Sequence, residues 1–238
     1  MMDFGLLMSV IVALAVPAAL ARRRPLLGFE EGESVIDVFV VPGAVGLLVG
    51  RLVTLALDDP RSIGGLSDML VIRSGVEFWP AVLSAALVVA WQSRRAGVQA
   101  LTRLAGLAPW AMVGYASYEA ACIFRDGCFG PVGSLGLKPD GMDQRMFPIG
   151  LALGVAVASA AAFVTWVHRL GWPPLAIVAS ATALVALARS WASIWLPRVG
   201  EAMTRQQRSS IVVAILAATA CLVEVWLQRH QRTSVVSA

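Results

Sequence analysis

The sequence predicts an all-α membrane protein with seven transmembrane helices, organised as a single polytopic domain over residues 1–238. Hydrophobic residues make up 58% of the chain and charged residues only 14%, and the mean hydropathy is +0.75. A soluble domain carries about 25% charged residues. The polar stretches between the apolar runs are too short for a soluble catalytic domain. The runs that approach or reach the ~20 residues of a bilayer crossing are 4–20, 35–57, 78–93, 104–124, 147–167, 175–196 and 210–227.

The first run predicts a retained helix rather than a cleavable signal peptide. Arg22, Arg23 and Arg24 follow this run, whereas a signal peptide carries its positive charge before the apolar core. Arginines close to the helix ends favour an N-terminus outside the cell and a cytoplasmic C-terminus. The net charge of +4 fits contact with anionic lipid head groups. The sequence contains no module of basic and aromatic residues, so we predict no nucleic-acid partner.

The second run combines close helix packing with a charge inside the membrane. Gly46 and Gly50 have the small-xxx-small spacing that lets two helices approach closely. Arg51 follows directly, and a charge in such a place marks a candidate functional site. The alternative is that its side chain reaches the interface and pairs with Asp58 or Asp59. The third run opens with a proline in its first turn, as a helix start favours.

Residues 114–148 form the stretch in which chemistry is most expected, because many ionisable groups there adjoin apolar sequence. With the predicted orientation, this helix end and loop face outward. Glu119 lies in the apolar part, where a carboxylate must find a cation or stay protonated. Arg125, six residues on, is one structural partner. We further predict an ion pair between Glu119 and an intramembrane arginine, either Arg51 or Arg189.

The cysteines of this stretch, Cys122 and Cys128, are compatible with two structures. They could form a disulfide in an oxidising compartment. A metal site is weakly indicated, since there is no CxxC motif and the two histidines, His168 and His230, belong to the opposite side. We therefore predict no metal and no cofactor. Cys221 lies in the middle of the seventh run and is interpreted as packing.

The fifth and sixth runs predict tightly packed helices, the sixth with a charge in it. The fifth is rich in alanine and glycine, which suits close packing. Arg189 crosses the sixth run and either binds a ligand or forms a structural pair with Glu119 or Asp126.

Several short motifs resemble the prolipoprotein diacylglyceryl transferase family, in particular a divergent branch of it. Residues 49–52, VGRL, resemble the family's G-A-R-L at the end of the second helix. Residues 122–130, CIFRDGCFG, resemble the tail of the family signature, and residues 145–148, RMFP, resemble the following R-x-P. Arg189 is placed as the arginine of the family's Y-G-x-x-R-F. The seven-helix topology with an outer N-terminus is similar as well.

The resemblance implies a multi-pass protein of the bacterial cytoplasmic membrane that transfers diacylglyceryl from phosphatidylglycerol to a lipoprotein cysteine, releasing glycerol 1-phosphate. Cations must hold the phosphate, and a base must activate the thiol. The implied partners are an anionic phospholipid and a lipoprotein precursor or another membrane protein. The implied substrate-binding residues are Arg51, Arg125, Arg145 and Gly130, and the implied catalytic residues are Arg189, Glu119 and Asp126, with Glu119 or Asp126 as the base.

The chain also departs from the family at positions that matter for catalysis. Glu119 stands where the signature has an arginine, and Trp79 begins the segment aligned with the family's H-G-G, so the histidine is absent. Val185 replaces the tyrosine before Arg189. A second hypothesis is therefore a degenerate family member that serves as a lipid-binding or structural subunit of a membrane complex. A third is an unrelated transporter or scaffold, although no internal repeat supports it.

Overall fold

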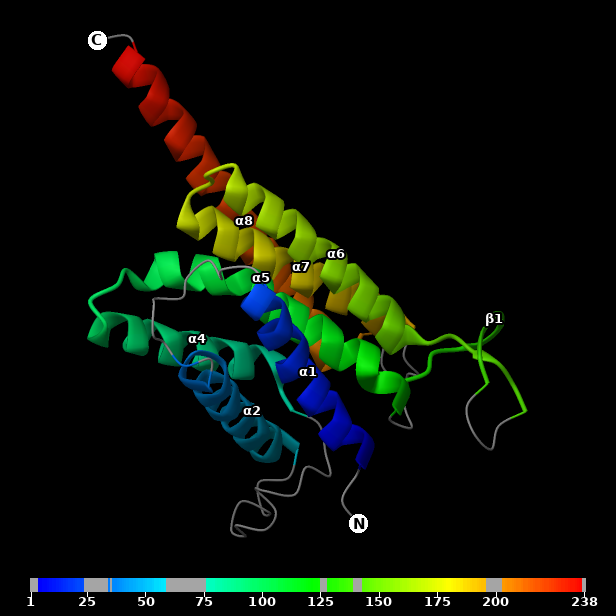
Figure 1. Ribbon diagram of the computed structural model, residues 1–238. Coiled ribbons are helices and arrows are strands. Elements are labelled where there is room, and N and C mark those ends of the chain that lie inside the picture. Colours follow the sequence, from blue (N-terminus) through cyan, green and yellow to red (C-terminus); the bar gives the residue numbers. More distant parts are fainter. Residues whose placement is uncertain are drawn as a thin grey trace. The chain divides into compact units, whose positions relative to one another are not determined.

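The computed structural model describes residues 4–23, 34, 36–58, 76–124, 128–138, 143–195 and 203–236. Helices dominate this part of the chain (Figure 1). Each predicted apolar run falls on an α-helix, and the α-helices are α1 (Phe4–Arg23), α2 (Val41–Asp58), α4 (Phe78–Arg95), α5 (Ala100–Ala120), α6 (Ile149–Arg169), α7 (Pro174–Ile194) and α8 (Arg205–Val236). A π-helical turn, Ile36–Val40, precedes α2, and a 3-10 turn, Ala121–Phe124, follows α5.

Four helical segments in the described part are long and apolar enough to cross a membrane: Asp37–Asp58, Ile149–Arg169, Pro174–Ile194 and Arg205–Gln228. The chain therefore has the character of an α-helical membrane protein. The apolar part of α1, Met8–Leu20, is shorter. Helices α4 and α5 are less apolar because they carry charges. Helix α4 ends in Arg94 and Arg95, and α5 contains Arg103. The arrangement with seven crossings stays a prediction.

The helices belong to two compact units, residues 28–104 and residues 1–27 with 105–238. In the smaller unit α2 packs along α4. A Cβ atom on Gly46 would lie 2.7 Å from the carbonyl oxygen of Ala81, so only glycine permits this approach. Thr54 of α2 binds the residue that precedes α4, because its hydroxyl accepts a hydrogen bond of 2.9 Å from the backbone N–H of Glu77. The predicted packing role of the glycine pair is confirmed.

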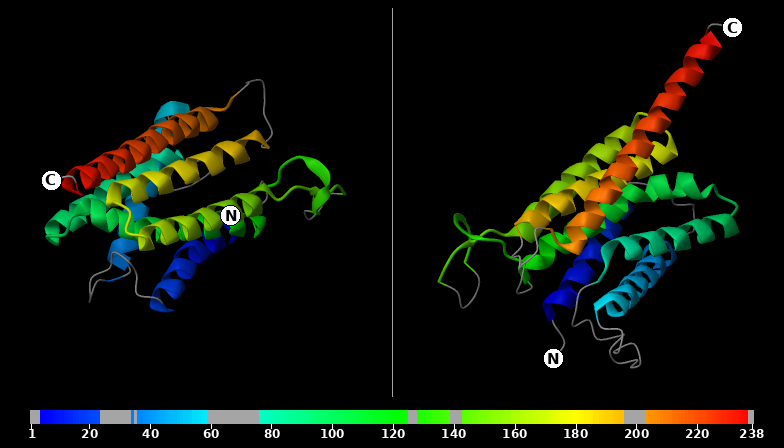
Figure 2. Two further views of the ribbon diagram at one scale, coloured as in Figure 1. Left: turned by 90° about the horizontal axis from the view of Figure 1, so that it is seen from above. Right: turned by 180° about the vertical axis from the view of Figure 1, so that it is seen from behind.

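The larger unit is built around α7, which lies between α6 and α8 (Figure 2). Gly171, with a φ of +74°, makes the tight turn from α6 to α7. The buried residues of α6 recur at helical spacing, as Leu153, Val157, Ala161 and Val164. Alanines dominate the buried face of α7, which keeps the helices close together.

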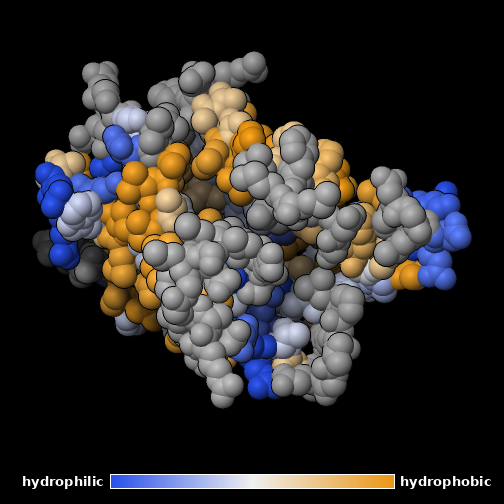
Figure 3. All heavy atoms as spheres, turned by 90° about the horizontal axis from the view of Figure 1, so that it is seen from below, coloured by the Kyte–Doolittle hydropathy of each residue, from blue (hydrophilic) through white to orange (hydrophobic). Residues whose placement is uncertain are grey.

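Much of the outer surface of the larger unit is apolar, as expected where helices meet lipid. In the most apolar stretch of 18 residues, half of α7 is buried, whereas only 11% of the corresponding stretch of α8 is buried. The exposed side chains of α8 include Val212, Ile215, Leu216 and Leu222. Apolar residues also cover broad areas of the face shown in Figure 3.

The segment from Cys128 to Pro148, which we call the β1 loop, contains a short strand that the predicted all-α fold class does not include. Strand β1 (Val132–Leu137) forms antiparallel bridges with Met146 at both of its ends. Gly130 donates to the carbonyl of Phe147 at 2.7 Å, and the N–H of Phe147 donates to the carbonyl of Pro131 at 3.1 Å. The loop sequence is rich in glycine, so alternation of apolar and polar residues is too short there to indicate a strand.

Candidate functional site

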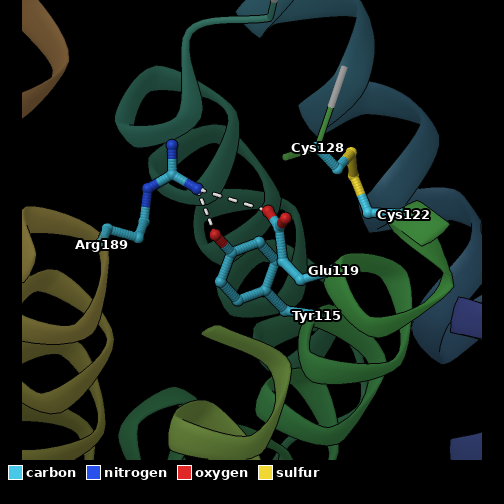
Figure 4. Close-up of polar contacts among 5 residues, drawn as sticks. All are labelled: Tyr115, Glu119, Cys122, Cys128 and Arg189. Atoms are coloured by element: carbon cyan, nitrogen blue, oxygen red, sulfur yellow. Dashed lines mark hydrogen bonds and ion pairs between the residues drawn. A yellow bond between two sulfur atoms is a disulfide. The ribbon is translucent and has the colours of Figure 1, made fainter. Parts of the chain in front are cut away.

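The site forms where α5 and α7 present three polar side chains to one another (Figure 4). Tyr115 and Glu119 are four residues apart on α5, so they lie one above the other on the same face of that helix. Arg189 comes from α7, one turn before its end. The arginine side chain is 8% exposed and the glutamate side chain 16% exposed, which leaves both largely shielded from their surroundings.

The Arg189 guanidinium bridges the two α5 side chains. Its Nη1 atom donates a hydrogen bond to the Tyr115 hydroxyl and lies 3.8 Å from Oε1 of Glu119. The predicted ion pair between Glu119 and an intramembrane arginine is thus confirmed, with Arg189 as the partner. A separation of 3.8 Å exceeds the length of a hydrogen bond. The two charges offset each other without a direct bond between them.

A cavity of about 180 Å³ lies beside this cluster, and we call it the site cavity. One water molecule requires ~10–15 Å³ on the same measure, so the site cavity can hold a larger group. It lies near the end of α5, the beginning of α6, the last turns of α7 and the beginning of α8. Its described lining residues are Glu119, Cys122, Cys128, Ile149, Gly150, Leu153, Arg189, Ala192, Ser193 and Gln206.

A disulfide bond between Cys122 and Cys128 forms one wall of the site cavity. The Cα atoms are 5.7 Å apart, within the usual range for a disulfide. Of the two structures that the sequence left open for this pair, the disulfide is the one observed. Gly150 packs against it, since a Cβ there would lie 2.8 Å from the Cβ of Cys122. Within the described ranges, no group of three His, Cys, Asp or Glu residues is arranged for a metal ion.

The other predicted site residues have different positions. Gly130 is buried near the backbone of Trp195 and Phe147, where it helps to anchor the β1 loop. Arg145 is exposed in that loop. Arg51 is buried in the smaller unit, with 5% of its surface exposed. Arg125 and Asp126 lie outside the described residues, so the convergence of four arginines on one cavity stays a prediction.

Three residues of the site were missed by sequence reasoning: Tyr115, Ser193 and Gln206. Tyr115 carries a detectable signal, because it precedes Glu119 by one helical turn in an otherwise apolar run. It supplies a phenol to Arg189 from α5, whereas the resembled family has a tyrosine before the arginine on the same helix. Ser193 donates to the carbonyl of Ser190 at 2.7 Å. Gln206 reaches the site cavity from the first turn of α8, which only the packing of α7 on α8 brings about.

The fold and the site together define an α-helical membrane protein with a cavity near its helix ends, lined by the largely buried pair of Arg189 and Glu119. No protein-family model matches the chain, and no curated protein matches it in sequence.

Proposed function

We propose that this chain binds the head group of a phospholipid in the site cavity. The observation that carries the proposal is the position of Arg189, which is buried, lines a cavity and lies near the end of a helix long and apolar enough to cross a membrane. Phospholipid head groups lie beyond the ~30 Å hydrocarbon core, so a cation near the end of a spanning helix is within reach of them. A buried arginine inside a membrane protein is costly and is commonly retained for a ligand.

The chemistry of the cavity suits a phosphate. A guanidinium is permanently charged, and its planar arrangement of donors matches phosphate oxygens. Ser193 and Gln206 add polar groups to a wall that also contains the apolar side chains of Ile149 and Leu153. An apolar cavity with a few polar groups is typical of small-molecule sites.

Aromatic side chains at the same helix end support a location at the membrane interface. The rings of Trp191 and Trp195 lie 6.4 Å apart, and the ring of Phe147 lies 6.3 Å from that of Trp195. Trp191 and Trp195 are exposed. Tryptophans gather at the level of the head groups in membrane proteins, so this arrangement supports access to the site cavity from a lipid leaflet.

Diacylglyceryl transfer from phosphatidylglycerol to a lipoprotein cysteine is a second candidate, because a carboxylate and a guanidinium, the groups required as base and phosphate-binding cation, both line the site cavity. In that reaction the cysteine thiol would give its proton to the Glu119 carboxylate. A carbon–sulfur bond would form as the bond between the glyceryl carbon and the phosphate oxygen breaks. Glycerol 1-phosphate would leave with the bond's electron pair, its charge stabilised by Arg189.

Lipid binding without transfer is the better supported of the two candidates. The 3.8 Å ion pair engages the base and the phosphate-binding cation with each other. The carboxylate therefore offsets part of the positive charge with which Arg189 would stabilise the leaving phosphate. A lipid-binding or structural subunit of a membrane complex, as a degenerate relative of the transferases, fits this arrangement.

Lipid retention tests the proposed function. The protein would be purified in mild detergent, and co-purified phospholipid would be counted by native mass spectrometry. Arg189→Gln is expected to lower retention about tenfold, as the loss of a charge-assisted hydrogen bond implies. Arg169→Gln is the matched control, because Arg169 is exposed at the opposite end of α6. Equal retention by both variants, with Arg189→Gln monodisperse, would contradict the proposal.

A transfer assay separates the two candidates. Labelled phosphatidylglycerol would be incubated with the protein and a lipoprotein-precursor peptide that contains one cysteine. We expect no label on the peptide. Label transfer that Glu119→Gln abolishes would establish the transferase instead.

A further inference from the structure

The wall of the site cavity carries two opposite charges. Among its described lining residues, the charged side chains are those of Arg189 and Glu119, whose formal charges cancel. Their closest charged atoms, Nη1 and Oε1, are 3.8 Å apart, too far for a hydrogen bond. The described wall of the site cavity therefore presents charges of both signs rather than positive charge alone.

A purely anionic head group does not match this environment. Its phosphate would gain from Arg189 but would stand close to the Glu119 carboxylate, and like charges in a shielded site repel strongly. A head group with a phosphate and an ammonium matches both charges. The phosphate then faces Arg189 while the ammonium donates to Glu119, and charges of opposite sign alternate.

The type of ammonium follows from the wall of the cavity. A primary ammonium has three N–H donors for a carboxylate. A quaternary ammonium has none and is usually recognised by a cage of aromatic rings. Within the described part of the chain, the residues that line the site cavity carry no aromatic ring. The wall therefore suits a primary ammonium.

We propose that the site cavity selects a zwitterionic head group, a phosphate diester with a primary ammonium as in phosphatidylethanolamine, over the anionic head group of phosphatidylglycerol. This inference rests on the proposed function, since it names the class of lipid that the same cavity binds. Arg189 holds the phosphate and Glu119 holds the ammonium. Tyr115 fixes the guanidinium from α5 through its hydroxyl.

The same chemistry occurs in a lipid and in a small soluble molecule, namely glycerophosphoethanolamine, which keeps both the phosphate diester and the primary ammonium. Soluble glycerophosphoethanolamine that displaces bound phosphatidylethanolamine would show that the zwitterionic head group is sufficient. Failure of such displacement, with phosphatidylethanolamine bound, would show that the acyl chains are required and that the ligand is taken from the membrane.

The test uses the wild-type chain in nanodiscs of phosphatidylcholine that contain equal small fractions of phosphatidylethanolamine and phosphatidylglycerol. After extraction, native mass spectrometry gives the ratio of the lipids retained. We expect phosphatidylethanolamine to be enriched about tenfold over phosphatidylglycerol relative to the bilayer, and phosphatidylcholine to show no enrichment. Retention of phosphatidylglycerol equal to or above that of phosphatidylethanolamine would overturn the inference while the proposed function stands. Retention of none of the three lipids would overturn the proposed function itself.

Glu119→Gln tests the role assigned to the carboxylate. This variant keeps the size of the side chain and removes the charge that faces the ammonium. We expect it to lose the preference for phosphatidylethanolamine and to gain binding of phosphatidylglycerol, because Arg189 is no longer offset. Glu224→Gln is the matched control, a charge removal on α8, where Glu224 accepts a hydrogen bond from Gln228. An unchanged preference in Glu119→Gln would overturn the inference. The comparison of head groups by the wild-type chain decides the question if this variant does not fold.

Discussion

Gly154 of α6 lies directly against Ala116 of α5: a Cβ atom on Gly154 would stand 2.8 Å from the carbonyl oxygen of Ala116 and 3.0 Å from the Cβ of Ala120. Two helix backbones approach this closely only where a side chain is missing. The contact holds the α5 residues Ala116 and Ala120 against α6, and Tyr115 and Glu119 on the same helix contact Arg189 of α7.

Gly154→Val should destabilise the protein by about 1–3 kcal/mol, the usual cost of forcing methyl groups into a filled space. The measurement is the thermal unfolding midpoint in detergent. Ala158→Val places the same side chain on the exposed face of α6 and should leave the midpoint nearly unchanged. Equal midpoints for both variants would mean that α5 and α6 are not in contact at Gly154.

Glu119→Gln should lower the free energy of unfolding by about 1–3 kcal/mol, because it leaves a shielded guanidinium without its carboxylate. Full burial would make the loss larger, but the Glu119 side chain is 16% exposed and 3.8 Å from Nη1 of Arg189. Chemical denaturation in detergent gives the value. Asp143→Asn is the control, since the Lys138–Asp143 pair is exposed, and should have no measurable effect.

Tyr115→Phe removes the hydroxyl that accepts a hydrogen bond from Arg189 and keeps the aromatic ring. The expected loss of stability is about 1 kcal/mol, with a several-fold loss of retained phospholipid because the guanidinium is less well oriented. Stability and lipid retention are measured on the same preparation. Tyr118→Phe is the control on the neighbouring position of α5, outside the site cavity. A variant that loses stability but keeps full lipid retention would make Tyr115 structural only.

Thiol counting should detect one free cysteine in the denatured, unreduced protein and three after reduction. The chain contains three cysteines, and Cys221 is the free one beside the Cys122–Cys128 disulfide. The disulfide should contribute about 2 kcal/mol for a loop of this size, so reductant should lower the unfolding midpoint. Cys221→Ala should leave that response to reductant intact. Three free thiols before reduction would rule out the bond.

Labelling from outside the cell tests the orientation expected from the sequence. In a cysteine-free background, Ser134→Cys in the β1 loop should react with a membrane-impermeant maleimide in intact cells. Arg169→Cys, at the other end of α6, should react only after the cells are lysed. The reverse pattern would place the β1 loop in the cytoplasm.

Apolar runs predicted the helices well, because a chain that crosses lipid must satisfy its backbone hydrogen bonds within each segment. Each predicted run falls on a helix, and the packing role of Gly46 and Gly50 followed from their spacing alone. The strand in the β1 loop was not predictable. It depends on two bridges to Met146, fourteen residues beyond Val132, and no local alternation marks it.

The ion pair was predictable from the free-energy cost of an unpaired charge, whereas the cavity was not predictable. A carboxylate and an arginine that both lie in apolar helices are expected to pair, because either charge alone is unfavourable there. The choice of Arg189 over Arg51 required the packing of α5 near α7. The contribution of Gln206 required the packing of α8 on α7. The resemblance to diacylglyceryl transferases stays a prediction, as does the convergence of Arg51, Arg125 and Arg145 on this cavity.

The bridge from Arg189 to α5 also bears on how the chain enters the membrane during synthesis. An arginine raises the free energy of inserting a lone helix by up to about 2.5–3.5 kcal/mol at the helix centre, and by less toward an end. In the predicted arrangement with seven crossings, the ribosome delivers Tyr115 and Glu119 to the bilayer before Arg189. An arriving α7 would then find a hydroxyl and a carboxylate for its guanidinium. In that arrangement, integration of α7 is coupled to the earlier arrival of α5, and a chain that lacks both α5 groups would release α7 into the membrane less efficiently.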